Sequence, residues 1–325
     1  MRALSISFMK DLLTPDGVLH PLLERIKQDH TLMLSIRKDY INIYYRGGNI
    51  LRVKEQNAGS YSSYFNEEYD KLGISVPTIP STIRSKNDSV VWVNAFQELK
   101  VIMDCYFSTY SKPEREFKQL IARENNFSTI SNQSEYFVSD IEFADPDIGA
   151  RFDILALQWL VTQRKKTGGC RPALIEMKYG DNALSGSSGL IKHIEDIDAL
   201  ITDKGRYQTL IITMENQFNQ LDKLGLLKFN RIANWTNIKI ASDEKPEVIF
   251  ILANHNPRSS VLGSILSDSR LDDFDTSSNF DLRFFVSSFS GYALHADCMV
   301  SLGEFRKLVV QNRPDTNQRI DLQQQ

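Results

Sequence analysis

The spacing of apolar residues between positions 111 and 253 predicts strands and helices in a definite order. Compact apolar runs occur at 136–143, 151–161, 172–178 and 247–253, and short runs of this kind are typical of strands. The run at 172–178 stays apolar almost to its end, which predicts a strand that is buried on both faces.

Helical spacing fills the gaps between these strands. Ser111 is expected to cap a helix that has Pro113 in its first turn and Phe117 and Ile121 on its apolar face. Apolar residues repeat at helical spacing again at 187–202 and 206–227. The resulting order is helix, three strands, two helices and a strand, which predicts a mixed sheet covered by helices.

The flanking regions carry weaker patterns. Residues 39–45 and 49–54 alternate around Gly47 and Gly48, which predicts a β-hairpin. The other expectations are loops with short helices at 55–90, a helix at 89–110, a strand pair at 280–300, a helix at 301–310 and a loose polar tail at 311–325.

Composition narrows the class of protein only a little. No apolar run approaches the roughly 20 residues that a membrane helix needs, so we expect no membrane segment. Cys105, Cys170 and Cys298 lie far apart and are odd in number, which favours a reducing cytoplasm over a disulfide framework or a zinc cluster. The formal net charge of −3 neither supports nor excludes a nucleic-acid substrate.

Charged residues interrupt two of the apolar strands. Glu176 and Lys178 are two positions apart, so their side chains point to the same face of a strand. Asp153 lies between Phe152 and Ile154 in the strand before. Because a lone buried charge is costly, neighbouring apolar strands that both carry charged residues predict a shared centre.

A hard cation is the physical reason to place two carboxylates together. Like charges in contact raise each other's pKa unless something positive holds them ionised, and Mg²⁺ prefers oxygen ligands while keeping several waters. We therefore expect Asp153 and Glu176 to hold Mg²⁺, for which Mn²⁺ can substitute, with the carbonyl of Met177 completing the shell. Lys178 would position the attacking water or neutralise developing charge.

The same residues resemble a known nuclease signature. The sequence GARFD at 149–153, followed by IEMK at 175–178, is similar to the motif of the PD-(D/E)XK nuclease superfamily, which includes restriction endonucleases and Holliday-junction resolvases. The core of that family is a helix, a three-strand meander, a helix and a strand. The resemblance covers 111–253 and implies an α/β, restriction-endonuclease-like core.

The resemblance also implies an acidic residue on the first helix. The match to the resolvase-like branch selects Glu114 as a metal ligand, with Glu116 as the second choice. The Pro-Asp pair of the family name ends here at Asp147, which stays an alternative to Asp153, although Asp153 has the better strand context. The implied catalytic residues are Glu114, Asp153, Glu176 and Lys178.

Polar groups after the Glu176 strand are candidates for contacts with nucleic acid. Ser187 and Ser188 precede a helix whose first amides could cradle a phosphate, and Lys192 and His193 follow on that helix. The spacing is not that of a nucleotide-binding P-loop. The alternative interpretation is that these residues are ordinary exposed polar positions.

One main hypothesis and one alternative follow. The main hypothesis is a cytoplasmic, Mg²⁺-dependent endonuclease acting on DNA, with a role in bacterial restriction or mobile-element defence by analogy. The alternative is a catalytically inactive nuclease fold that binds nucleic acid or assembles with protein. We expect an N-terminal α+β extension at 1–110 for recognition, a nuclease domain at 111–310 and a tail at 311–325. A homodimer is one arrangement that the resemblance implies.

Overall fold

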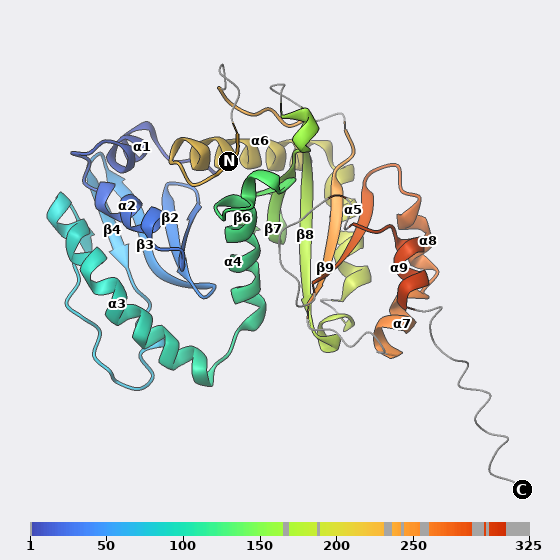
Figure 1. Ribbon diagram of the computed structural model, residues 1–325, viewed down its shortest axis with the longest axis horizontal. Helices are drawn as coiled ribbons and strands as arrows, with labels where there is room; N and C mark the ends of the chain where they lie inside the picture. The colour runs from blue at the N-terminus through green and yellow to red at the C-terminus, as the bar shows by residue number, and fades with distance from the viewer. Residues whose placement is uncertain are drawn as a thin grey trace, which may run out of the picture.

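Two five-stranded sheets lie side by side in the computed structural model, with helices on their faces (Figure 1). The structure describes residues 2–164, 169–186, 189–230, 236–241, 244–253, 260–287, 296 and 299–309. No helix within these ranges is long and apolar enough to cross a membrane. The predicted α/β class, with a mixed sheet flanked by helices, is confirmed.

The N-terminal sheet is antiparallel, with its strands in chain order. The predicted hairpin is confirmed, but its turn lies at Arg46 and Gly47, which have φ values of 49° and 72°, and Gly48 already belongs to a strand. Positive φ at both central residues is what a tight hairpin turn requires. The strands are β1 (Leu32–Ile36), β2 (Tyr40–Tyr45), β3 (Gly48–Asn57), β4 (Ser60–Tyr64) and β5 (Thr82–Ile83).

The expectation of loops and short helices at 55–90 is wrong for β4 and β5. In β4, Tyr61 is fully buried and its hydroxyl donates to Asp11 Oδ2 at 2.6 Å. Serines on both sides of this tyrosine hide the inward–outward alternation from a pattern based on hydrophobicity. Three helices accompany the sheet, and the last contains the helix predicted at 89–110: α1 (Ile6–Leu13), α2 (His20–Gln28) and α3 (Lys86–Thr109).

The second sheet is mixed. Its first three strands form an antiparallel meander, and the last two run parallel to the third, in the order β10-β9-β8-β7-β6. The strand pair predicted at 280–300 is found as β10 and one antiparallel bridge from Phe284 to Val300. The strands are β6 (Tyr136–Asp145), β7 (Ala150–Gln158), β8 (Arg171–Tyr179), β9 (Glu247–Ala253) and β10 (Asp281–Ser287).

Helices cover both faces of the second sheet. α4 (Pro113–Asn126) packs Ile121 against Ile175 and Met177 on one face, while α5 (Leu190–Thr202) and α6 (Lys204–Lys223) cover the other. Lys112, and not the predicted Ser111, occupies the N-cap of α4. A proline in the first turn has no amide donor to satisfy, so this helix can begin without a capping side chain.

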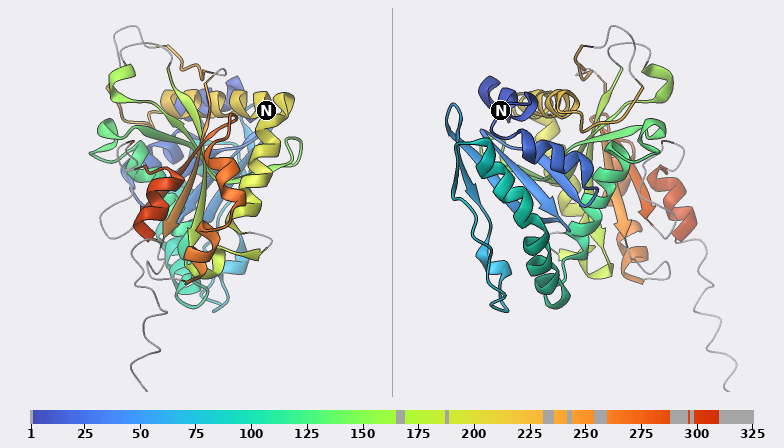
Figure 2. Two further views of the ribbon diagram at one scale, coloured as in Figure 1. Left: turned by 90° about the vertical axis from the view of Figure 1, so that its right-hand side faces the viewer. Right: turned by 60° about the vertical axis from the view of Figure 1, so that its left-hand side comes forward.

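The remaining helices stand beside β10. They are α7 (Ser260–Leu266), α8 (Arg270–Asp275) and α9 (Leu302–Val309). The sequence predicts α9 but not the two short helices before it. Figure 2 shows these helices and the N-terminal sheet at opposite ends of the molecule. The tail predicted at 311–325 lies outside the described residues.

A buried ion network joins the two sheets. Asp140 of β6 is fully buried and accepts hydrogen bonds from Arg2 at 3.2 Å, from Gln217 at 2.8 Å and from Arg37. Arg37 follows β1 and also donates to the carbonyl of Ile141 at 2.7 Å. Because these charges are buried together, each depends on the others for its partner. The network therefore holds β6 against the N-terminal sheet.

Candidate active site

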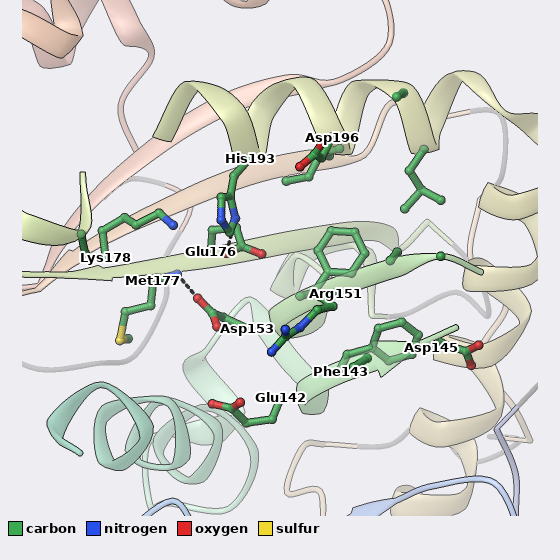
Figure 3. Close-up of a pocket in the computed structure, with 18 of the residues that line it drawn as sticks. Glu142, Phe143, Asp145, Arg151, Asp153, Glu176, Met177, Lys178, His193 and Asp196 are labelled. Atoms are coloured by element: carbon green, nitrogen blue, oxygen red, sulfur yellow. Dashed lines mark hydrogen bonds and ion pairs between the residues drawn. The ribbon is translucent and has the colours of Figure 1, made fainter. Parts of the chain in front are cut away.

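Three neighbouring strands each place one carboxylate at the same level of the second sheet. β7 and β8 pair as far as Ile154 and Ile175, so the next residues in that register are Asp153 and Glu176. The register of β6 with β7 sets Glu142 opposite Asp153. Figure 3 shows the three side chains around one cavity. The ladder between β7 and β8 ends at this level, where the side chain of Asp153 accepts a hydrogen bond from the backbone of Met177.

Asp153 is held by donors from two elements. Its Oδ1 accepts from Lys118 Nζ at 2.8 Å, and its Oδ2 accepts from the backbone N–H of Met177 at 2.9 Å. Burial alone would raise the pKa of the Asp153 carboxyl, but Lys118, the Met177 amide and Lys178 outweigh burial and hold this pKa below its usual value. The carboxylate is therefore ionised and fixed in orientation.

Glu176 is more deeply buried, with a side chain that is 3 % exposed. Its Oε2 lies 2.8 Å from Nδ1 of His193 on α5. Burial raises the pKa of the Glu176 carboxyl above its usual value; His193 and Lys178 oppose the rise, and the Asp153 carboxylate adds to it. An additional positive charge in the cleft would therefore stabilise the ionised form of Glu176.

Lys178 extends from the same face of β8 as Glu176 and is buried. Burial lowers the pKa of the Lys178 ammonium, although Glu176, Asp153 and Glu114 oppose the shift. A lysine with a lowered pKa exchanges its proton more readily at neutral pH, which suits a group beside an attacking water.

Two charged residues of this centre are not among those that the sequence predicts. Lys118 of α4 lies within 3.0 Å of carboxylate oxygens of Glu114, Glu142 and Asp153. Burial alone would lower the pKa of Lys118, but the three carboxylates outweigh it and raise this pKa. Two features of the sequence could have indicated these residues. Lys118 follows Glu114 by one helical turn, and Glu142 interrupts the apolar pattern of β6 as Asp153 interrupts that of β7.

Glu142 also has an unusual backbone. Its φ of 52° lies in the left-handed region, which costs a non-glycine residue about 1–3 kcal/mol and persists only where the surroundings enforce it. This conformation occurs within β6, opposite Asp153. The strain is therefore located at the cluster of carboxylates.

The structure separates the alternatives for the acidic residues. Glu114 lines the cleft, whereas Glu116 on the same helix pairs with Arg46 of the hairpin at 2.8 Å. Asp153 lines the cleft, whereas Asp147 is exposed in the turn between β6 and β7 and does not. The geometry therefore favours Glu114 and Asp153 over their alternatives.

The cleft itself has a volume of about 920 Å³ and combines acidic with cationic side chains. Arg206 of α6 lies along it and donates to the carbonyls of Ile148 at 2.6 Å and Gly149 at 3.0 Å. Arg151 is exposed and extends into the cavity near Asp153 (Figure 3). Cationic groups beside a carboxylate cluster suit a negatively charged substrate that reacts at a metal centre.

The structure describes two of the four residues that the sequence suggests as nucleic-acid contacts. Ser187 and Ser188 lie outside the described residues. His193 lines the cleft, but its Nδ1 is engaged with Glu176. Lys192 is exposed and pairs with Asp196 one turn along α5, at 2.5 Å. Of the two that the structure describes, His193 lines the cleft and Lys192 does not, and the contact of His193 there is with a carboxylate.

The acidic residues of the cleft are its possible ligands for a metal ion. Within the part of the chain that the structure describes, no group of three or more His, Cys, Asp or Glu side chains is arranged to hold a metal ion. Asp153 and Glu176, with the backbone of Met177, are the candidates that the cleft offers. An ion here would take only part of its shell from carboxylates, as Mg²⁺ does when it keeps several waters.

Comparisons with protein-family models, curated proteins and solved structures give no match to this chain. The structure itself defines an α/β protein whose cleft lies over a mixed sheet and is lined by buried carboxylates and a buried lysine. Its function has to be inferred from the chemistry of that cleft.

Proposed function

We propose that this chain is a metal-dependent nuclease that hydrolyses phosphodiester bonds in DNA. The observation that carries the proposal is the grouping of Asp153, Glu176 and Lys178 in one cleft, at the level where β7 and β8 stop pairing. A role in restriction or mobile-element defence would follow by analogy with modules of this kind.

The order of elements supports a restriction-endonuclease-like core. α4, the β6–β8 meander, the helices α5 and α6, and β9 follow one another as in the core of the PD-(D/E)XK family. The charged residues also fall where the resemblance expects them, on the second and third strands of the meander.

The donor set fits a hard divalent cation. Asp153 and Glu176 supply oxygen ligands, and the raised pKa of buried Glu176 indicates that its ionised form lacks sufficient compensating charge. Mg²⁺, or Mn²⁺ in its place, would be held by Asp153, Glu176 and the carbonyl of Met177, with Glu114 close by. When bound, such an ion lowers the pKa of a coordinated water and stabilises charge on a phosphate.

The chain's own residues account for the other requirements of the reaction. Lys178 would orient the attacking water and exchange a proton with it. His193 fixes the orientation of Glu176, and Lys118 fixes that of Asp153. Arg151 would neutralise a backbone phosphate that enters the cleft.

A non-catalytic module for nucleic-acid binding or protein assembly is the second candidate. The contacts of Lys118 favour it, because they neutralise carboxylates of the cleft without a metal ion. The two candidates differ in one observable, since only a nuclease cleaves DNA and stops doing so when Glu176 or Lys178 is replaced.

Cleavage assays test the proposal. Supercoiled plasmid, linear duplex, single-stranded DNA and RNA are incubated with the protein, each with and without Mn²⁺. We expect Mn²⁺-dependent cleavage of DNA, reduced about 100-fold or more in Glu176→Ala and Lys178→Ala. Cleavage by these variants at the wild-type rate would sink the proposed site, and binding without cleavage would support the non-catalytic module.

Matched variants outside the cleft serve as controls. Glu116→Gln is the control for Glu114→Gln, because both residues lie in the first turn of α4 but only Glu114 lines the cleft. Asp147→Asn is the control for Asp153→Asn, because Asp153 lines the cleft and Asp147 does not. The control variants should retain wild-type cleavage.

A further inference from the structure

Lys118 lies where three carboxylates converge. Its Nζ is 3.0 Å from Glu114 Oε1, 2.5 Å from Glu142 Oε1 and 2.8 Å from Asp153 Oδ1. The three oxygens come from α4, β6 and β7, so the cluster forms only in the folded chain. The side chain of Lys118 is 3 % exposed, which leaves the ammonium almost no contact with bulk water.

Neutralising a buried lysine does not require so many carboxylates. Lys100, another buried lysine, contacts one carboxylate oxygen of Asp29 at 2.5 Å and the hydroxyl of Thr31 at 2.7 Å. Around Lys118, three carboxylates lie within 3.0 Å of a single ammonium. Without the ammonium, Glu142 and Asp153 would repel each other across adjacent strands.

The oxygen atoms around Lys118 are of the kind that surrounds a hard metal ion. Mg²⁺ takes carboxylate oxygens at about 2.0–2.1 Å, so each of the three oxygens would need to move by roughly 1 Å or less to hold such an ion in place of the ammonium. The cluster also adjoins the proposed metal site, because Asp153 belongs to both. Its Oδ1 accepts from Lys118, and its Oδ2 accepts from the Met177 amide.

We infer that Lys118 is a built-in cation that occupies the place of a second divalent ion, so that the cleft binds one metal ion and not two. The inference rests on the proposed function, since it concerns the metal requirement of the same site. Lys118 is a positioning residue in this scheme, because it acts on the reaction through the carboxylate of Asp153.

Counting bound metal ions tests the inference. The metal-free, full-length protein is titrated with Mn²⁺, and the number of bound ions is measured by calorimetry and by the electron paramagnetic resonance signal of free Mn²⁺. We expect one ion in the wild type and in Lys118→Arg, which keeps the cation. We expect two ions in Lys118→Met, which removes the charge and keeps most of the side-chain volume. Adding Glu142→Gln to Lys118→Met should return the count to one.

The controls separate failure of the inference from failure of the proposed function. Lys100→Met also removes a buried lysine, but it lies on α3 and should bind one ion. Equal counts in the wild type and Lys118→Met overturn the inference. A count of one in both leaves the proposed metal site standing, whereas a count of zero in both removes the proposed function as well.

A folding measurement covers the case in which Lys118→Met does not fold without metal. Circular dichroism is then followed during the same Mn²⁺ titration. Saturable recovery of the folded signal, absent in the double variant with Glu142→Gln, supports the inference. A variant that stays unfolded at every Mn²⁺ concentration overturns it.

Discussion

The substitution Asp140→Asn removes the negative charge at the junction of the two sheets. Asp140 is fully buried and accepts hydrogen bonds from Arg2, Arg37 and Gln217. Asparagine keeps the shape of the side chain but removes the carboxylate that pairs with buried Arg37, whereas Arg2 keeps Asp145 at 3.5 Å. Removing one partner of a buried ion pair costs about 3–5 kcal/mol, because the other charge stays buried. Since the carboxylate of Asp140 also accepts hydrogen bonds from Arg2 and Gln217, we expect the upper part of that range.

This loss of unfolding free energy can be measured by calorimetry as a fall in the melting temperature, Tm. An unfolding entropy of about 2.1 cal/mol/K per residue amounts to about 0.7 kcal/mol/K for 325 residues, so about 4–5 kcal/mol lowers Tm by about 6–7 °C. The control is Asp272→Asn, which breaks the pair of an aspartate that is 60 % exposed with Arg306 and should cost less than about 1 kcal/mol. A fall in Tm for Asp140→Asn no larger than that of the control would refute the reasoning.

Three further predictions concern single residues. Gly47→Ala should lower the free energy of unfolding in denaturant more than Gly59→Ala. Both glycines have a positive φ (72° and 74°), but only at Gly47 would an added Cβ lie 2.4 Å from the backbone of Arg115. Equal losses of stability in the two variants would contradict this close approach. Burial raises the pKa of the Cys170 thiol from 9.0 to about 12, so the stability linked to the protonated thiol is complete below pH 9.0 and is lost as pH rises toward 12. Peptide mapping should therefore find Cys170 alkylated at mildly alkaline pH only after unfolding, and rapid labelling of the native protein would count against its burial. Arg151→Ala should weaken DNA binding in fluorescence anisotropy and reduce the slope of log K against log salt by about 1; an unchanged slope would place Arg151 away from the phosphates.

The local hydrophobic pattern was sufficient to predict an element where the residues of that element are themselves mostly apolar. β9 is buried along its whole length and β8 is buried except at its two end residues, and a strand in that position must be apolar whatever packs on it. The same requirement made Asp153, Glu176 and Lys178 conspicuous, because a charge in such a strand needs a partner. The prediction of a centre at these residues thus came from the cost of burial, and the structure places all three along one cleft.

Elements without a strong hydrophobic signal could not be predicted in this way. β4 reads as a polar loop, because serine is compatible with either face of a strand. The N-cap of α4 was assigned to Ser111 on its hydroxyl, but the helix begins one residue later on the geometry of Pro113. In both cases the side chain permits several backbone conformations, and packing selects among them.

The sequence by itself determined the strands of the second sheet, the hairpin and the charged residues that interrupt buried strands, because each of these depends on the residues in its own segment. Only the tertiary structure decided that Lys118 and Glu142 belong to the same centre. Lys118 lies 35 positions before Asp153 in the chain and meets it through the packing of α4 against the meander. A lysine on a helix has the same local sequence signature whether its ammonium faces water or three carboxylates, and only the fold determines which of these surrounds it.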